Sequence, residues 1–420
     1  MARGTLDRRN FLRLSGAAAG TALAGRAGAQ DYMVQTLIEQ TRRGDFGQGF
    51  DYGSRSAGVP ASTLPTLSSR TIQATEQAIP QYEGIVARGG WPYVRPGHRL
   101  RLGARHGAVV PLRQRLVASG DLDPRAGMTD IFDSYVEAAV RRFQMRHGLT
   151  ADGAVSDATY AALNVPAPVR LSQLRTNAVR LRIFGGNLGD RYVLCNIPGT
   201  QIEAIENGMV ASRHSAVVGK PDRPSPDIQS KVVEVNFNPF WTVPPSIVRK
   251  DLIPKMQAQP DYLTQNRIRI IDPRGYELHP SQINWYSDEA THYMFKQDPG
   301  DFNSLGTIRI NFPSAHGVYM HDTPLKNLFG EDMRFHSSGC VRVQNVRELV
   351  TWLLDGTPGW SRAEIDRVIR SSERRDARPS HYVGVYWVYI TAWASPDGAV
   401  QFRDDIYSRD GIGPMAAMRG

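Results

Sequence analysis

Residues 316–324 read HGVYMHDTP and residues 334–343 read RFHSSGCVRV, the densest group of reactive side chains in this 420-residue chain. A free cysteine with a pKa of about 8.5 is mostly protonated at neutral pH, so a cysteine nucleophile needs a proton acceptor. An imidazole can take that proton and later return it to a leaving amine. The pattern therefore favours Cys340 as a nucleophile with a nearby histidine as its base. Gly339 allows a sharp turn that can aim backbone N–H groups at a developing oxyanion.

The spacing of these residues matches a family pattern. Fifteen residues separate His321 from Ser337, and the run SSGCVRV then follows. This pattern resembles the active-site motif of L,D-transpeptidases with a YkuD-like catalytic domain. Residues 219–226 (GKPDRPSP), 238–247 (NPFWTVPPSI) and 319–324 (YMHDTP) also resemble the large periplasmic members, so the likeness covers about residues 90–415. Ser338 stands where many members have histidine and Arg342 where they have asparagine, as in the large Gram-negative subgroup.

The resemblance implies a reaction and a set of site residues. Cys340 would attack the carbonyl of the L-centre at position three of a donor stem tetrapeptide, releasing D-alanine and forming a thioester. An amine of an acceptor stem would then form a 3→3 cross-link. His321 would serve as base and then acid, and the N–H groups of Gly339 and Cys340 would bind the oxyanion. The remaining residues implied for substrate binding are Ser338, Tyr319, Arg342 and Trp241.

The resemblance also implies which other molecules take part. No metal or organic cofactor is expected, and carbapenem β-lactams are expected to acylate the cysteine. Two other activities stay open. The same site with water as acceptor would be an L,D-carboxypeptidase or another peptidoglycan hydrolase, and a wall-binding protein without catalysis is the second alternative. The motif does not separate transfer from hydrolysis, because the groove and its cover choose the acceptor.

The other cysteine and the neighbouring histidines are expected to have no part in catalysis. Cys195 lies in the apolar run 192–197 and is expected to be a buried core thiol. A disulfide between Cys195 and Cys340 would abolish the activity. His316 and His336 are expected to lie outside the chemistry. A zinc site built from these histidines and Cys340 has suitable residue types but lacks the usual short ligand spacing.

The N-terminus reads as an export signal. An arginine pair at residues 8–9 precedes Phe11-Leu12 and a weakly apolar run, and residues 27–29 (AGA) suit a signal peptidase. Residues 1–29 resemble a twin-arginine signal, and a general secretory signal is the alternative. The apolar run is shorter than the roughly 20 residues that span a bilayer. We therefore expect a periplasmic protein with no stable membrane span.

Composition excludes several protein classes. Apolar residues make up 41% and charged residues 22% of the chain, which is a globular composition. The formal net charge is +9, and residues 1–29 hold five arginines and one aspartate, so the remainder carries +5. That mild excess suits an anionic polymer and does not predict nucleic-acid binding. Two cysteines exclude a disulfide-rich scaffold.

The rest of the chain predicts an α+β protein with several parts. Residues 30–104 read as a helical segment with a Gly/Ser/Pro-rich loop. Apolar residues at helical spacing in residues 105–165 resemble a three-helix peptidoglycan-binding domain, and a plain helical spacer is the alternative. Residues 166–190 read as a connecting helix. The strand-like runs of residues 191–415 predict a mainly-β catalytic domain. Its last strong strands are expected over residues 383–393 and 399–402 with a turn sequence at residues 395–398 between them, and a helix is expected near residues 346–354. Residues from about 245 to 305 are too long for a plain connection and read as an inserted cap.

Overall fold

The computed structural model describes residues 63–411, and a single compact unit contains all of them. The expected export signal and residues 30–62 lie outside the described residues. Among residues 63–411, no helix combines the length and apolar character that a bilayer crossing needs.

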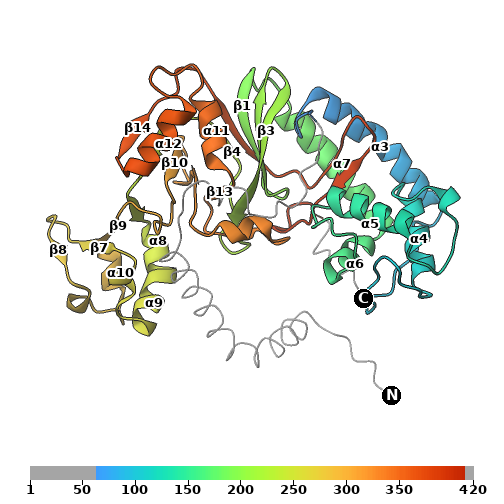
Figure 1. The fold of residues 1–420 in the computed structure, drawn as a ribbon, viewed down its shortest axis with the longest axis horizontal. Helices are drawn as coiled ribbons and strands as arrows, with labels where there is room; N and C mark the ends of the chain where they lie inside the picture. Colours follow the sequence, from blue (N-terminus) through green and yellow to red (C-terminus); the bar gives the residue numbers. More distant parts are fainter. Residues whose placement is uncertain (1–62, 412–420) are drawn as a thin grey trace. The chain divides into compact units, whose positions relative to one another are not determined.

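The strand-like segments build one large sheet of eleven strands (Figure 1). Its order is β14 (Arg375–Ala377), β5 (Glu234–Phe237), β10 (Ile308–Asn311), β11 (Met320–His321), β13 (Val341–Val343), β3 (Met209–Gly219), β2 (Gln201–Glu206), β1 (Arg191–Asn196), β15 (Gly384–Val388) and β4 (Ile228–Lys231), with β12 (Phe335–Ser337) paired to β3. β4 and β5 stand near opposite ends of this order, yet only two residues join them. The sheet must therefore curl on itself.

One face of this sheet packs on two helices, α11 (Val346–Leu353) and α12 (Arg362–Ser371). Both helices are amphipathic, and α11 buries Val346, Leu349, Val350 and Leu353 in a core shared with the strands. At roughly 1.5–3 kcal/mol for each fully buried large aliphatic side chain, this layer holds the strands in register. The expected helix near residues 346–354 is α11, whereas α12 and the long strand β3 were not foreseen.

The helical part matches its expected elements closely. Helices α4 (Val109–Ala118), α5 (Ser134–Arg146) and α6 (Asp157–Leu163) share one buried apolar cluster. Gly148 follows α5 with φ +68°, and the Ser156 side chain accepts a hydrogen bond from the Thr159 N–H at the start of α6. The connecting helix is α7 (Ala167–Phe184), and it packs beside α3 (Ser69–Ala87).

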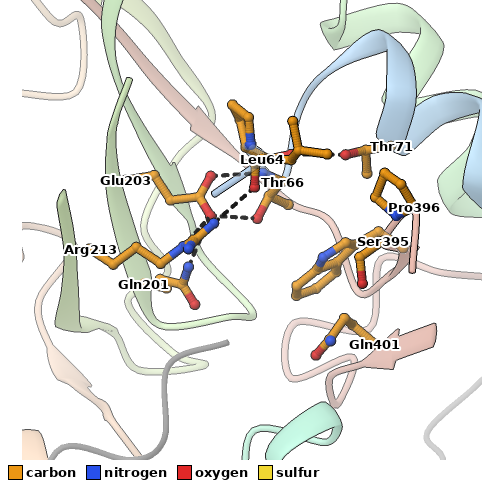
Figure 2. A pocket seen from close by; sticks show the side chains of 11 residues that line it. Leu64, Thr66, Thr71, Gln201, Glu203, Arg213, Ser395, Pro396 and Gln401 are labelled. Carbon is orange, nitrogen blue, oxygen red and sulfur yellow. Dashed lines mark hydrogen bonds and ion pairs between the residues drawn. The ribbon is translucent and has the colours of Figure 1, made fainter. Parts of the chain in front are cut away.

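Polar contacts fix the flanking segments to the sheets. The buried Glu203 carboxylate on β2 accepts hydrogen bonds from the backbone and hydroxyl of Thr66, from Gln201 and from Arg213 (Figure 2). Arg146 of α5 pairs with Asp121 at 2.6 Å and donates to the Val400 carbonyl at 3.1 Å. The three-helix part is therefore joined to the catalytic part by buried contacts.

The single strand expected over residues 383–393 is interrupted. β15 belongs to the large sheet, and β16 (Ala392–Ala394) pairs instead with β17 (Val400–Phe402) in a separate hairpin. The turn sequence at residues 395–398 closes this hairpin, and the Gly398 N–H donates to the Ser395 carbonyl.

Residues 241–297 form a second small sheet with its own core, and we refer to them as the inserted subdomain. The strand order is β6 (Trp241–Val243), β9 (Met294–Gln297), β7 (Ile268–Ile271) and β8 (Glu277–Leu278). Helices α8 (Pro245–Ile247), α9 (Ile253–Ala258) and α10 (Tyr262–Gln265) complete it (Figure 1). Phe295 and Leu263 are fully buried in this core. The subdomain begins at β6, earlier than the expected residue 245.

Candidate active site

A row of polar side chains crosses three neighbouring strands of the large sheet. The register pairs Arg309 on β10 with His321 on β11, and His321 with Arg342 on β13. Directly paired residues project from the same face of a sheet, and residues two positions apart share that face. Tyr319 and Cys340 therefore belong to the same face, whereas Met320 and Val341 between them are buried in the core. Strand pairing thus places the Cys340 and His321 side chains on the same face of two neighbouring strands.

His321 is held as a neutral imidazole. Its side chain is 5% exposed, and its Nδ1–H donates to the backbone carbonyl of Asp322 at 2.5 Å. That bond fixes the tautomer and leaves the Nε2 lone pair available to accept a proton. Burial first, and then the positive charges of Arg342 and Arg309, lower the pKa of His321 to about 3. The imidazole is therefore unprotonated throughout the neutral range.

Cys340 sits on a turn that two serines hold in place. Gly339 has φ +114°, a conformation that side-chain-bearing residues rarely adopt. The Ser337 hydroxyl donates to the Cys340 carbonyl at 2.5 Å, and the Ser225 hydroxyl donates to the Gly339 carbonyl at 2.8 Å. Gly339 N–H, expected as an oxyanion donor, donates to Ser337 Oγ at 3.2 Å. One of the two expected oxyanion donors is therefore already hydrogen-bonded within the turn.

The surroundings of the Cys340 thiol act on its pKa in two directions. Burial raises the pKa of Cys340, and hydrogen bonds from the Tyr319 backbone and side chain, with the charges of Arg309 and Arg342, act in the opposite direction. Arg342 is itself largely buried, its pKa is lowered by burial, and its Nε has no hydrogen-bond partner among the described residues. A thiolate or an anionic substrate would compensate that buried cation.

Two contacts connect the site to the inserted subdomain. Tyr319, whose pKa is raised by burial and by the nearby thiol, also has a side-chain hydrogen bond with Trp241 of β6. Arg223 donates to Ser338 Oγ at 3.0 Å and to Asp251 Oδ1 at 3.0 Å. The exposed Ser338 therefore contacts an arginine that is also paired with the inserted subdomain. Through Arg223, the position of the inserted subdomain is coupled to Ser338, the residue that precedes Gly339.

Comparison with known proteins identifies the domains. The YkuD family model, described as an L,D-transpeptidase catalytic domain, matches residues 190–365. Residues 190–365 therefore match an L,D-transpeptidase catalytic domain of the YkuD family. The model described as "Putative peptidoglycan binding domain" matches residues 105–163. A Haemophilus influenzae protein named "Putative L,D-transpeptidase" is 34% identical over 239 residues, 57% of this chain and 48% of that protein. The chain thus spans about half the length of this curated relative.

Solved structures of L,D-transpeptidases are also similar in part. One from Xylanimonas cellulosilytica is 15% identical, covers 70% of this chain and 99% of its own, and has a TM-score of 0.22. L,D-transpeptidase 3 from Mycobacterium tuberculosis, solved with a faropenem-derived adduct, is 13% identical, covers 47% of this chain and 60% of its own, and also has a TM-score of 0.22. At these identities and TM-scores, the solved structures add nothing to the two domain matches.

The other candidate residues of this L,D-transpeptidase domain lie away from the thiol chemistry. Cys195 is fully buried on β1, and both cysteines are free thiols. His316 is exposed, with its N–H bonded to Ser314. His336 is exposed and bonds Glu331 at 3.0 Å. Within residues 63–411, no group of three or more His, Cys, Asp or Glu side chains is placed to hold a metal.

Sequence reasoning missed several residues of the site. Arg309 was not a candidate, although its Cζ lies 4.8 Å from the centre of the Tyr319 ring. Ser225, Ser337 and Arg223, which brace the turn before Cys340, were also missed. The alternating run IRIN at residues 308–311 did place Arg309 on the polar face of a strand. Nothing in the sequence showed that this strand pairs with the one carrying His321.

Proposed function

We propose that this protein is a cysteine-dependent L,D-transpeptidase that forms 3→3 cross-links between peptidoglycan stem peptides. The observation that carries the proposal is the shared sheet face, which holds a turn-borne thiol, a neutral imidazole and two guanidinium groups. Cys340 is the nucleophile and His321 the general base and acid. The catalytic-domain match over residues 190–365 supports this reaction class.

The geometry suggests how the acyl transfer proceeds. Because thiol and imidazole are both neutral, Cys340 Sγ forms its bond to the carbonyl carbon while its proton passes to His321 Nε2. The Cys340 N–H, with Gly339 N–H once Ser337 releases it, stabilises the oxyanion. Collapse breaks the bond to D-alanine, whose amine takes the proton from His321. An acceptor amine then attacks the thioester, gives its proton to His321, and the thiol is restored.

The flanking parts support a wall-bound enzyme. Residues 105–163 match the peptidoglycan-binding family model, and we propose that they hold the enzyme on the sacculus. Export by the twin-arginine route to the periplasm is part of the same proposal. The inserted subdomain acts as a cap that excludes water and favours an amine acceptor, because Trp241 and Asp251 tie it to the site.

The experiment is mass spectrometry of muropeptides after incubation of the full chain with donor tetrapeptide substrates. The proposal expects 3→3 dimers and free D-alanine, and carbapenem addition should give a covalent adduct on Cys340. Tripeptide without dimer would instead assign an L,D-carboxypeptidase. Neither product, together with binding to sacculi, would assign a wall-binding protein.

The cap's role has its own measurement. Asp251→Asn removes the charge that pairs with Arg223, and it should raise the ratio of tripeptide to dimer about two- to fivefold. Acylation by a small β-lactam should change little, because that ligand needs less of the groove. Asp288→Asn is a matched control, since its exposed carboxylate pairs with Arg249 within the same subdomain. An unchanged ratio in Asp251→Asn would show that the subdomain is only a structural insertion.

A further inference from the structure

A groove opens on the large sheet beside β10, the strand that carries Arg309. Its volume is about 790 Å³, and it is lined by residues of three separated segments, 231–234, 309–313 and 378–382. Three cations line it, Lys231, Arg309 and Arg378, against a single carboxylate, Glu234. Tyr382 and Val233 add apolar surface, with exposed fractions of 62% and 39%. The groove is therefore cationic, with an exposed aromatic side chain at its rim.

Arg309 connects this groove to the nucleophile. It lines the groove, it pairs across strands with His321, and its guanidinium stacks on the Tyr319 ring. Tyr319 in turn contacts the Cys340 thiol. A molecule in the groove that reached Arg309 would therefore lie one side chain from the reacting centre.

A hydrogen-bond chain fixes the orientation of the Arg309 guanidinium. Arg309 Nε donates to Asn311, Asn311 donates to Asn236, and Asn236 donates to Glu234 at 2.8 Å and to Asp376 at 2.6 Å. The two amino groups of Arg309 make no ion pair or hydrogen bond within residues 63–411. An arginine with its Nε anchored and its amino groups available suits bidentate carboxylate recognition.

We propose that this groove binds a free carboxylate group of the peptide that reacts at Cys340. Arg309 contacts the carboxylate, and Lys231 and Arg378 supply the attractive field at the groove's outer part. The inference rests on the proposed function for the identity of that peptide, an acidic stem whose side-chain and terminal carboxylates are not amidated. Lys231 has no ion pair among the described residues, and Arg378 lies 3.5 Å from Glu234. The groove thus retains positive charge for a ligand.

The test measures binding without turnover. The full chain carrying Cys340→Ala is titrated by calorimetry with a soluble stem tetrapeptide and with the same peptide carrying carboxamides. The acidic peptide should bind about three- to tenfold more tightly. Adding Lys231→Glu should remove that preference by weakening the acidic peptide by a similar factor, and Arg378→Gln should act in the same direction more weakly. Affinity for the amidated peptide should stay constant.

A matched control separates the groove from general charge. Arg370→Glu makes the same charge change at an exposed residue of α12 outside the groove, and it should leave both affinities unchanged. No binding of either peptide, equal affinity for both, or equal loss in Lys231→Glu and Arg370→Glu would overturn the groove assignment. Failure of the proposed function would show separately, as absence of dimer in the muropeptide assay with the unmodified chain.

Discussion

Of the two cysteines of this protein, Cys195 is fully buried and Cys340 is half-buried, and their surroundings also differ in kind. Cys195 on β1 is fully enclosed, its strand neighbours are Ile202 and Trp387, and burial alone raises the pKa of its thiol far above the ordinary value. Burial also raises the pKa of Cys340, but hydrogen-bond donors from Tyr319 and two guanidinium groups act in the opposite direction. Burial alone therefore keeps a thiol protonated, whereas donors and cations around a buried thiol partly offset that effect.

The largest expected effect comes from removing the two thiols one at a time, which tests directly whether they differ in function. Cys340→Ala should abolish both the covalent β-lactam adduct and cross-linked product, because this thiol shares a sheet face with His321 and Cys195 lies in the apolar core. Cys195→Ala should leave both at wild-type levels and cost roughly 1–2 kcal/mol of stability through lost packing. Intact-mass spectrometry and urea denaturation measure the two consequences. An adduct retained by Cys340→Ala would move the nucleophile elsewhere.

A pair of histidines offers the next comparison. His321 and His214 are both almost fully buried, and both have a ring nitrogen bonded to a backbone carbonyl. His321→Ala should slow acylation by roughly 10²–10⁴-fold, the usual contribution of general acid–base catalysis. His214→Ala should destabilise the fold while leaving the single-turnover acylation rate of the folded protein near wild type. Wild-type acylation by His321→Ala would remove this residue from the mechanism.

Strand alternation explains how much of the site the sequence could reveal. The runs around residues 308–311, 319–321 and 340–342 each alternate polar and apolar residues, so the face of each strand was readable. The motif spacing joined His321 to Cys340. Arg309 and Arg223 were missed because they reach the site through pairings of β10 with β11 and of the 219–226 loop with the turn at Gly339. Such long-range register is set by the whole core, not by local residues.

The same difficulty explains the errors in the fold. β16 follows the apolar run of β15 with no turn residue between them, so the sequence predicted one strand. β16 nevertheless pairs with β17 in a two-stranded sheet that is separate from the sheet of β15. β6 was placed outside the cap because its pairing with β9 spans more than 50 residues of chain. The three-helix part was easier to predict, because caps at Ser156 and Gly148 and the apolar spacing on α5 are all local signals.

The acid dependence of acylation tests the His321 environment. In the proposed mechanism protonation of His321 removes the base, and since burial lowers its pKa to about 3, that loss should occur far below the ordinary value of about 6.5. Single-turnover acylation between pH 5 and 7.5 should therefore change less than about threefold per folded molecule. A fall of tenfold centred near pH 6.5 would show that the imidazole is not shielded as the structure indicates.

Stability in acid is the necessary control for that profile. A histidine whose folded pKa is lowered binds fewer protons folded than unfolded, so the free energy of unfolding falls as pH drops below about 6.5. His214, with a pKa lowered to about 4 by burial, should contribute up to about 1.4 kcal/mol per pH unit between those values. His214→Gln should flatten the dependence of the urea midpoint on pH in this range. An equally steep dependence in the variant would contradict the lowered pKa.

The smallest expected effect comes from the Tyr319 hydroxyl, the side-chain donor to the Cys340 thiol. Tyr319→Phe keeps the ring that stacks with Arg309 and the backbone N–H beside Cys340, and it removes only the hydroxyl shared between the thiol and Trp241. Losing one such hydrogen bond costs about 0.5–1.5 kcal/mol, so acylation should slow about two- to tenfold. Trp241→Phe removes the partner indole N–H and leaves the hydroxyl on the thiol, so it should slow acylation less. If Trp241→Phe slowed acylation more than Tyr319→Phe did, the hydroxyl would act mainly through its hydrogen bond to the inserted subdomain. The environment of Cys340 would then depend mainly on its backbone donor and its two arginines.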